Sequence, residues 1–128
     1  MILGFKERFV EPILNGVKIH TIREDRHNRW EQFRLIQFAT GVRTKQYNCF
    51  KELPCDSIQK IEITYQGKDI FVYVDGMYIY DSIAPHEISI NKMLCLAIND
   101  GFKSLDDFFE WFNKDFTGKI IHWTNFRY

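Results

Sequence analysis

Five short runs of β-branched and aromatic residues, separated by turn signals, constrain the fold of this chain more than any other feature. They are Phe33 to Thr40, Tyr47 to Phe50, Ile58 to Tyr65, Ile70 to Val74 and Met77 to Tyr80. Runs of this length and composition are typical of strands. Asp75-Gly76 between the last two runs predicts a type I′ hairpin, and the regular spacing predicts a small barrel or a strongly bent sheet.

Helical patterns and one more strand pattern precede and follow this region. Apolar residues from Phe9 to Leu14, with a proline in the first turn, predict a helix of under two turns. Lys18 to Arg23 alternates and predicts a strand, on which Lys18 and Thr21 point to opposite faces unless a bulge or a strand end intervenes.

The second half of the chain predicts two helices and a final strand. One helix is expected after Ser89, which is a candidate N-cap, and another from Leu105 to Asn113 after Ser104. Alternation from Lys119 to Tyr128 predicts a strand that is paired inside the sheet. The predicted fold class is therefore α+β.

The composition is that of one domain spanning residues 1–128. With 45% hydrophobic and 16% aromatic residues, the chain can bury a core of its own. No apolar run reaches the ~18 residues of a membrane span, and the first residues, MILGFKERF, acquire charge too early for a signal peptide. We therefore expect a cytoplasmic protein without a membrane partner.

The cysteines and histidines do not predict a metal site. The three cysteines lack CxxC spacing, which argues against a disulfide framework and against tetrahedral zinc. The four histidines have no metal-site spacing either; they are His20, His27, His86 and His122. We expect no metal and no cofactor.

Basic residues are concentrated in the first part of the chain. Residues 1–51 carry 10 basic and 5 acidic side chains, whereas the remainder carries 7 and 12. The molecule then has either a basic face suited to phosphate or charges that interleave on folding. Five basic residues are candidates for an RNA-binding surface with stacking aromatics: Arg26, Arg29, Arg34, Arg43 and Lys45. The alternative is that the neighbouring aromatics, Trp30, Phe33 and Tyr47, belong to the core and the basic side chains are only solvated.

The densest polar cluster extends from Gly16 to Arg23, directly after the short predicted helix. This segment resembles the ASCH domain family, whose signature is G-x-K-x-x-[E/T]-x-R, with Gly16, Lys18, Thr21 and Arg23 at the fixed positions. Asp100-Gly101-Phe102 before the aromatic helix is similar to the family's acidic-Gly-Phe turn. The resemblance implies a PUA-like fold, a small β-barrel flanked by helices, with a cleft suited to RNA or a modified nucleoside.

Thr21 stands where the family usually has Glu. In this respect the chain looks similar to small bacterial ASCH proteins that hydrolyse N4-acetylcytidine, and that resemblance implies Lys18, Thr21 and Asp100 as catalytic residues. Asp100 replaces a Glu and is shorter in reach by ~1.5 Å. Such a lysine would activate the threonine hydroxyl if its pKa were lowered, and Arg23 could lower that pKa or stabilise an oxyanion.

Three functions remain as alternatives from the sequence. The first is a module that binds RNA or a modified nucleoside, with Gly16 and Arg23 in contact with the ligand. The second is a metal-free amidohydrolase that acts on N4-acetylcytidine-like nucleosides. The third is a protein-interaction domain that retains only the fold, because the helix with Phe108, Phe109, Trp111 and Phe112 is aromatic nearly all round and predicts one exposed ring. A monomer is compatible with the sequence, which does not fix the oligomeric state.

Overall fold

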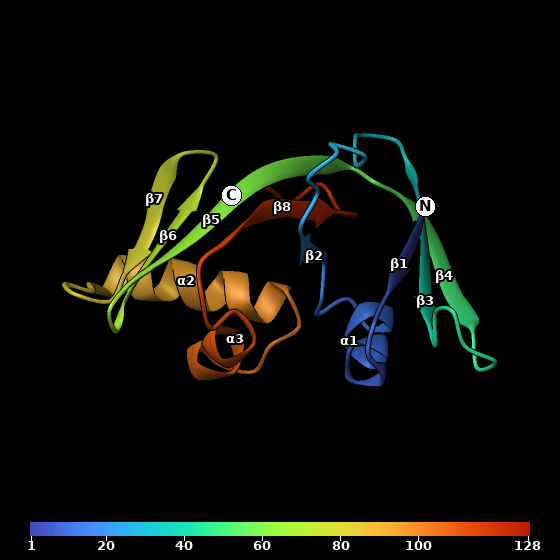
Figure 1. The fold of residues 1–128 in the computed structure, drawn as a ribbon, viewed down its shortest axis with the longest axis horizontal. Coiled ribbons are helices and arrows are strands. Elements are labelled where there is room, and N and C mark those ends of the chain that lie inside the picture. Colours follow the sequence, from blue (N-terminus) through green and yellow to red (C-terminus); the bar gives the residue numbers. More distant parts are fainter.

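The computed structural model describes residues 1–128 as a mixed α+β fold with two sheets (Figure 1). In the three-stranded sheet β1 runs parallel to β3, and β3 runs antiparallel to β4. Its order is β1 (Ile2–Gly4), β3 (Leu35–Thr40) and β4 (Asn48–Pro54). The five-stranded sheet is antiparallel throughout. Its order is β2 (His20–Arg23), β8 (Phe116–His122), β5 (Ser57–Gln66), β6 (Asp69–Val74) and β7 (Met77–Asp81).

Short helices connect and cover these sheets. They are the 3-10 helix η1 (Glu7–Phe9) and the α-helices α1 (Val10–Leu14), α2 (Glu87–Asn99) and α3 (Leu105–Trp111). In Figure 1, α2 and α3 lie beneath the long, curved strand β5, and α1 lies close to the three-stranded sheet. α2 packs on β7 and on α3. None of the helices is both long and apolar enough to span a membrane.

The predicted α+β class and the series of short strands are confirmed. Asp75 and Gly76 both have positive φ, 50° and 76°, as the type I′ turn between β6 and β7 requires. The strands form two sheets and no closed barrel, so the PUA-like barrel stays a prediction. β1 was not predicted from the sequence, because three residues that pair with a strand more than 30 positions away give no local pattern.

Several predicted boundaries are wrong. The strand predicted from Lys18 begins only at His20, and the helix predicted to end at Asn113 ends at Trp111. α2 begins at Glu87 with His86 as the N-cap; Ser89 is the third residue of the helix and forms a capping box with His86. The final strand, β8, runs from Phe116 only to His122. After it the chain leaves the sheet, and the main chain of Tyr128 bonds to the side chain of Gln59 instead of to another strand. The prediction that this strand is paired inside the sheet is confirmed, and its neighbours there are β2 and β5.

One core of 22 buried apolar residues joins the two sheets and the helices. Phe38 of β3, Ile61 of β5 and Phe108 of α3 are all fully buried in it. Trp123 packs edge-on against Phe38, with their ring centroids 4.8 Å apart. Because Trp123 directly follows β8, this contact joins the three-stranded sheet to the five-stranded one.

The close packing of β8 against β2 gives a first testable prediction. A Cβ at Gly118 would overlap the main-chain oxygen of Arg23 and the ring of Phe116. Because the main chain of β2 can move only with the sheet, we expect Gly118→Ala to lower the free energy of unfolding by about 1–3 kcal/mol in urea titrations. Thr117→Ala, at an exposed position of the same strand, is the control and should change stability by no more than about 0.5 kcal/mol. Equal stability of the two variants would contradict the close approach.

Candidate functional site

Lys18 lies between α1 and β2, where main-chain hydrogen bonds fix its segment from two sides. Its N–H donates to the Pro12 oxygen at 2.9 Å, and the N–H of Ile19 donates to the Asn99 oxygen at 2.9 Å. β2 begins only at His20, so Lys18 is outside the alternation of the strand. Lys18 and Thr21 therefore line the same cavity, which a continuous strand from residue 18 would prevent.

Asp100 reaches the same cavity from the end of α2. It is the C-cap of the helix, and its N–H donates to the oxygens of Leu96 and Ala97. Gly101 then reverses the chain with φ +93°. A Cβ at Gly101 would lie 2.9 Å from Cδ of Lys18 and 2.9 Å from a ring carbon of Phe9. The turn approaches Lys18 this closely because residue 101 has no side chain.

Lys18, Thr21, Arg23 and Asp100 line one cavity of about 400 Å³. This volume is in the range of small-molecule sites. Aromatic rings form much of its wall; they belong to Phe5, Phe9, Phe102, Trp111 and Phe112. The cavity thus combines a few polar groups with apolar, planar walls, which is the usual composition of a ligand pocket.

Lys18 and Asp100 form a buried ion pair. Nζ of Lys18 lies 3.2 Å from Oδ1 of Asp100 and also donates to the main-chain oxygen of Asp100. The ammonium is 4.9 Å from the centre of the Phe9 ring. Burial lowers the pKa of Lys18 to about 8, although the charge of Asp100 and its hydrogen bond act in the opposite direction. Lys18 is therefore much closer to losing its proton at neutral pH than a solvated lysine.

Arg23 binds the Thr21 hydroxyl and joins β2 to β1. Its Nε donates to Oγ1 of Thr21 at 3.2 Å, and its Nη2 donates to the oxygen of Gly4 at 2.6 Å. The guanidinium lies 5.0 Å from the centre of the Phe5 ring. Thr21 is thus held by a fixed cation beside the cavity, in a position to present its hydroxyl to a ligand.

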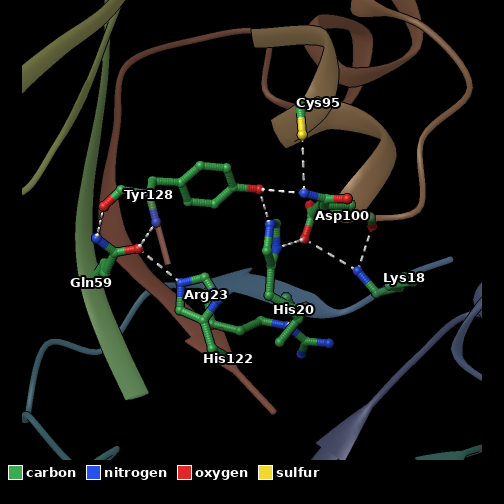
Figure 2. A network of polar contacts seen from close by, with 10 residues as sticks. Lys18, His20, Arg23, Gln59, Cys95, Asp100, His122 and Tyr128 are labelled. Carbon is green, nitrogen blue, oxygen red and sulfur yellow. Dashed lines mark hydrogen bonds and ion pairs between the residues drawn. The ribbon is translucent and has the colours of Figure 1, made fainter. Parts of the chain in front are cut away.

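A chain of polar contacts continues from Asp100 into the protein (Figure 2). Nδ1 of His20 is 3.1 Å from Oδ1 of Asp100, and Nε2 of His20 is 2.6 Å from the Tyr128 hydroxyl. Asn99 donates to that hydroxyl at 3.1 Å. Burial lowers the pKa of His20, so its imidazole is neutral at neutral pH.

Sequence reasoning assigned no role to His20, Tyr128 or the aromatic wall. His20 lies next to Thr21 on the predicted strand that carries the signature, and this position is the only sequence feature that indicates a role in the site. Tyr128 is 108 residues away from its partner His20 in the chain and gives no local signal. The aromatic helix does have an exposed ring, that of Trp111 at 43%. Trp111 borders the cavity, and Nζ of Lys6 lies 5.3 Å from the centre of its ring.

The other predicted site residues lie away from this cavity. Gly16 follows α1 in a turn, with φ +82°, and is exposed outside the cavity. None of the five candidate RNA-binding residues lines the cavity: Arg26, Arg29, Arg43 and Lys45 are exposed, and Arg34 is half-buried.

Acidic and aromatic neighbours surround these basic residues. Arg26 pairs with Glu24 at 3.4 Å, and Arg34 pairs with Glu31 at 3.2 Å. Of the interleaved aromatics, Trp30 is buried in the core, whereas Phe33 and Tyr47 are exposed. The RNA-binding surface stays a prediction in which Phe33 and Tyr47 are the accessible rings.

No group of three His, Cys, Asp or Glu residues is placed to hold a metal ion, and the three cysteines are free. Comparison of the chain with protein-family models, with curated proteins and with solved structures found no match. The relationship to the ASCH family therefore stays a prediction from the signature.

The burial of Lys18 predicts an unusual titration. In an NMR titration of the lysine side chains, Lys18 should titrate near pH 8, and solvated lysines near ~10.4. Asp100→Asn removes the charge that favours the ammonium and should lower the pKa of Lys18 further. The unfolded chain keeps this proton up to a higher pH than the folded one. Lys18 should therefore increase the free energy of unfolding as the pH rises from about 8 to about 10.5. A Lys18 that titrates with the solvated lysines would contradict its burial.

Proposed function

We propose that this chain is a PUA-like domain of the ASCH type whose cavity binds a modified nucleoside, free or within RNA. The observation that carries the proposal is that Lys18, Thr21, Arg23 and Asp100 line one cavity together with aromatic rings. Lys18, Thr21 and Arg23 belong to the signature near the start of the chain, and Asp100 belongs to the acidic turn, 82 residues after Lys18. If the similarity of these two segments to the family were a coincidence, there would be no reason for their residues to line the same cavity.

The chemistry of the cavity suits a nucleobase. A base is planar, so its two faces can stack on aromatic rings such as those of Phe5, Phe9 and Trp111. Its edge carries carbonyl and ring-nitrogen acceptors, which Lys18 and Arg23 can bind as donors. The carboxylate of Asp100 offers an acceptor for an amino group on the same edge.

Calorimetric titration with N4-acetylcytidine tests this proposal. We expect the wild-type protein to bind the nucleoside and Arg23→Ala to weaken the affinity by about tenfold, because a hydrogen bond from a charged donor is lost. Lys68→Ala removes an exposed basic side chain outside the cavity and serves as the control with unchanged affinity. A short single-stranded RNA is the second ligand, for which Arg26→Ala should also reduce the salt dependence. No binding of either ligand by the wild type would refute the proposal.

One observation favours a second function, a metal-free amidohydrolase. Lys18 is buried beside Asp100 with a pKa of about 8, and it shares the cavity with a threonine hydroxyl. An amine with such a pKa can act as a general base near neutral pH. A solvated lysine would be almost fully protonated there and could not accept a proton.

In this reaction Oγ1 of Thr21 attacks the carbonyl carbon of the N4-acyl group while neutral Lys18 takes the hydroxyl proton. Arg23 stabilises the oxyanion that forms. The bond from the carbonyl carbon to N4 then breaks, N4 receives a proton from Lys18, and the acyl group remains on Thr21. Water hydrolyses this ester, which releases the carboxylic acid and restores the hydroxyl.

Release of cytidine from N4-acetylcytidine, measured by chromatography, tests the second function. The rate should increase with pH up to about pH 8 and then level off, because the reaction needs the neutral form of Lys18. Thr21→Val and Lys18→Ala should abolish turnover, and Thr21→Val should retain binding of the nucleoside. Thr64→Val on β5 is the control for a threonine outside the cavity. Binding without turnover in the wild type would leave the binding function and exclude this reaction.

A further inference from the structure

We infer that His20 is a positioning residue of the candidate site: its imidazole, held between Asp100 and the Tyr128 hydroxyl, fixes the Asp100 carboxylate toward Lys18. The inference rests on the proposed function for its effect on ligand binding. The geometry of His20 itself can be tested without a ligand. Figure 2 shows Tyr128, His20, Asp100 and Lys18 as a continuous series of contacts.

The partners of His20 assign its protons. A carboxylate oxygen only accepts hydrogen bonds, so Nδ1 of His20 carries the hydrogen and donates to Oδ1 of Asp100 across 3.1 Å. Nε2 then has a lone pair and accepts the hydroxyl hydrogen of Tyr128 across 2.6 Å. The Tyr128 hydroxyl oxygen accepts from the side-chain amide of Asn99 at 3.1 Å. Each group has a single role, and the imidazole is in the Nδ1–H tautomer.

Tyr128 is fixed independently of His20. The side chain of Gln59 accepts from the Tyr128 main-chain N–H and donates to the Tyr128 main-chain oxygen, both at 2.9 Å. His122 donates through Nε2 to the same Gln59 oxygen at 3.0 Å. The His20, Gln59 and His122 side chains are all buried, and the His20 ring packs edge-on against His122 with centroids 5.2 Å apart. The imidazole is therefore enclosed on several sides and cannot turn away from Asp100.

This support matters because Asp100 occupies an unfavourable place for an anion. A carboxylate at the C-terminal end of a helix faces the negative end of the helix dipole. Only Lys18 and His20 donate to the carboxylate, and both bind Oδ1. Oδ2 is thereby left for a ligand in the cavity. Without His20, the carboxylate could rotate and Lys18 would lose its fixed partner.

The tautomer is tested on the wild-type protein without ligand by long-range ¹H–¹⁵N NMR of the histidines. We expect His20 to show a protonated Nδ1 and an unprotonated Nε2 at neutral pH. Tyr128→Phe removes the donor to Nε2 and should shift that resonance. Tyr78→Phe, which removes an exposed hydroxyl bonded to Asp81 at 2.8 Å, is the matched control and should leave it unchanged. An Nε2–H tautomer or a mixture of tautomers in the wild type would overturn the inference.

Two substitutions separate positioning from packing. The amide nitrogen of Asn can take the place of Nδ1, whereas that of Gln lies near the place of Nε2. His20→Asn should therefore keep the affinity for N4-acetylcytidine within about threefold, and His20→Gln should lower it by about tenfold. Equal losses in both variants would mean that His20 only fills space, which overturns the inference.

Failure of the proposed function would be recognised separately. If the wild type does not bind N4-acetylcytidine, the proposed function fails, and the tautomer experiment still decides the position of His20. If His20→Gln does not fold, as judged by circular dichroism, the spectra of the wild type and Tyr128→Phe decide the question.

Discussion

The ion pair between Lys18 and Asp100 connects parts of the chain that are 82 residues apart, and the site depends on it. Burying two charges is costly unless they are paired and their other bonding positions are satisfied. Here the ammonium also donates to the main-chain oxygen of Asp100, the C-cap of α2, and faces an aromatic ring, and the carboxylate accepts from His20. The pair therefore fixes the segment before β2 against the end of α2, and the cavity lies beside this junction.

The parts of the fold that could be predicted from the sequence are those whose signal is local. Asp75-Gly76 has the backbone conformation of its predicted hairpin, and Ser104 caps α3 by accepting from the N–H of Asp107. In both cases the side chains that determine the structure lie within four residues of each other. The same holds for α1, where Pro12 limits the helix and Gly16 follows it with positive φ.

Most features of the fold and the site that could not be predicted depend on contacts between residues far apart in the chain. Lys18 and Thr21 share a cavity because β2 begins only at His20, after residues 18 and 19 donate main-chain hydrogen bonds to Pro12 and Asn99. No pattern within residues 18–23 contains that information. The contact of His20 with Tyr128 likewise depends on β8 lying beside β2, where His20 is opposite His122. The N-cap of α2 is an exception, because its capping box is local: His86 is the N-cap although serine has the higher preference, and Ser89 serves the box from the third position of the helix.

The site differs from the rest of the core because most of the buried polar side chains are found there. Eight polar or charged residues are buried, and six of them belong to the group that joins the cavity to Tyr128: Lys18, His20, Thr21, Gln59, Asp100 and His122. Apolar residues in these positions would avoid the free-energy cost of removing polar groups from water. That cost is not fully offset here, because Nδ1 of His122 is buried without a hydrogen-bond partner. Departures from good packing that gather at one cavity are typical of functional sites. The concentration of buried polarity beside Lys18 therefore favours a role in binding or catalysis over a role in stability.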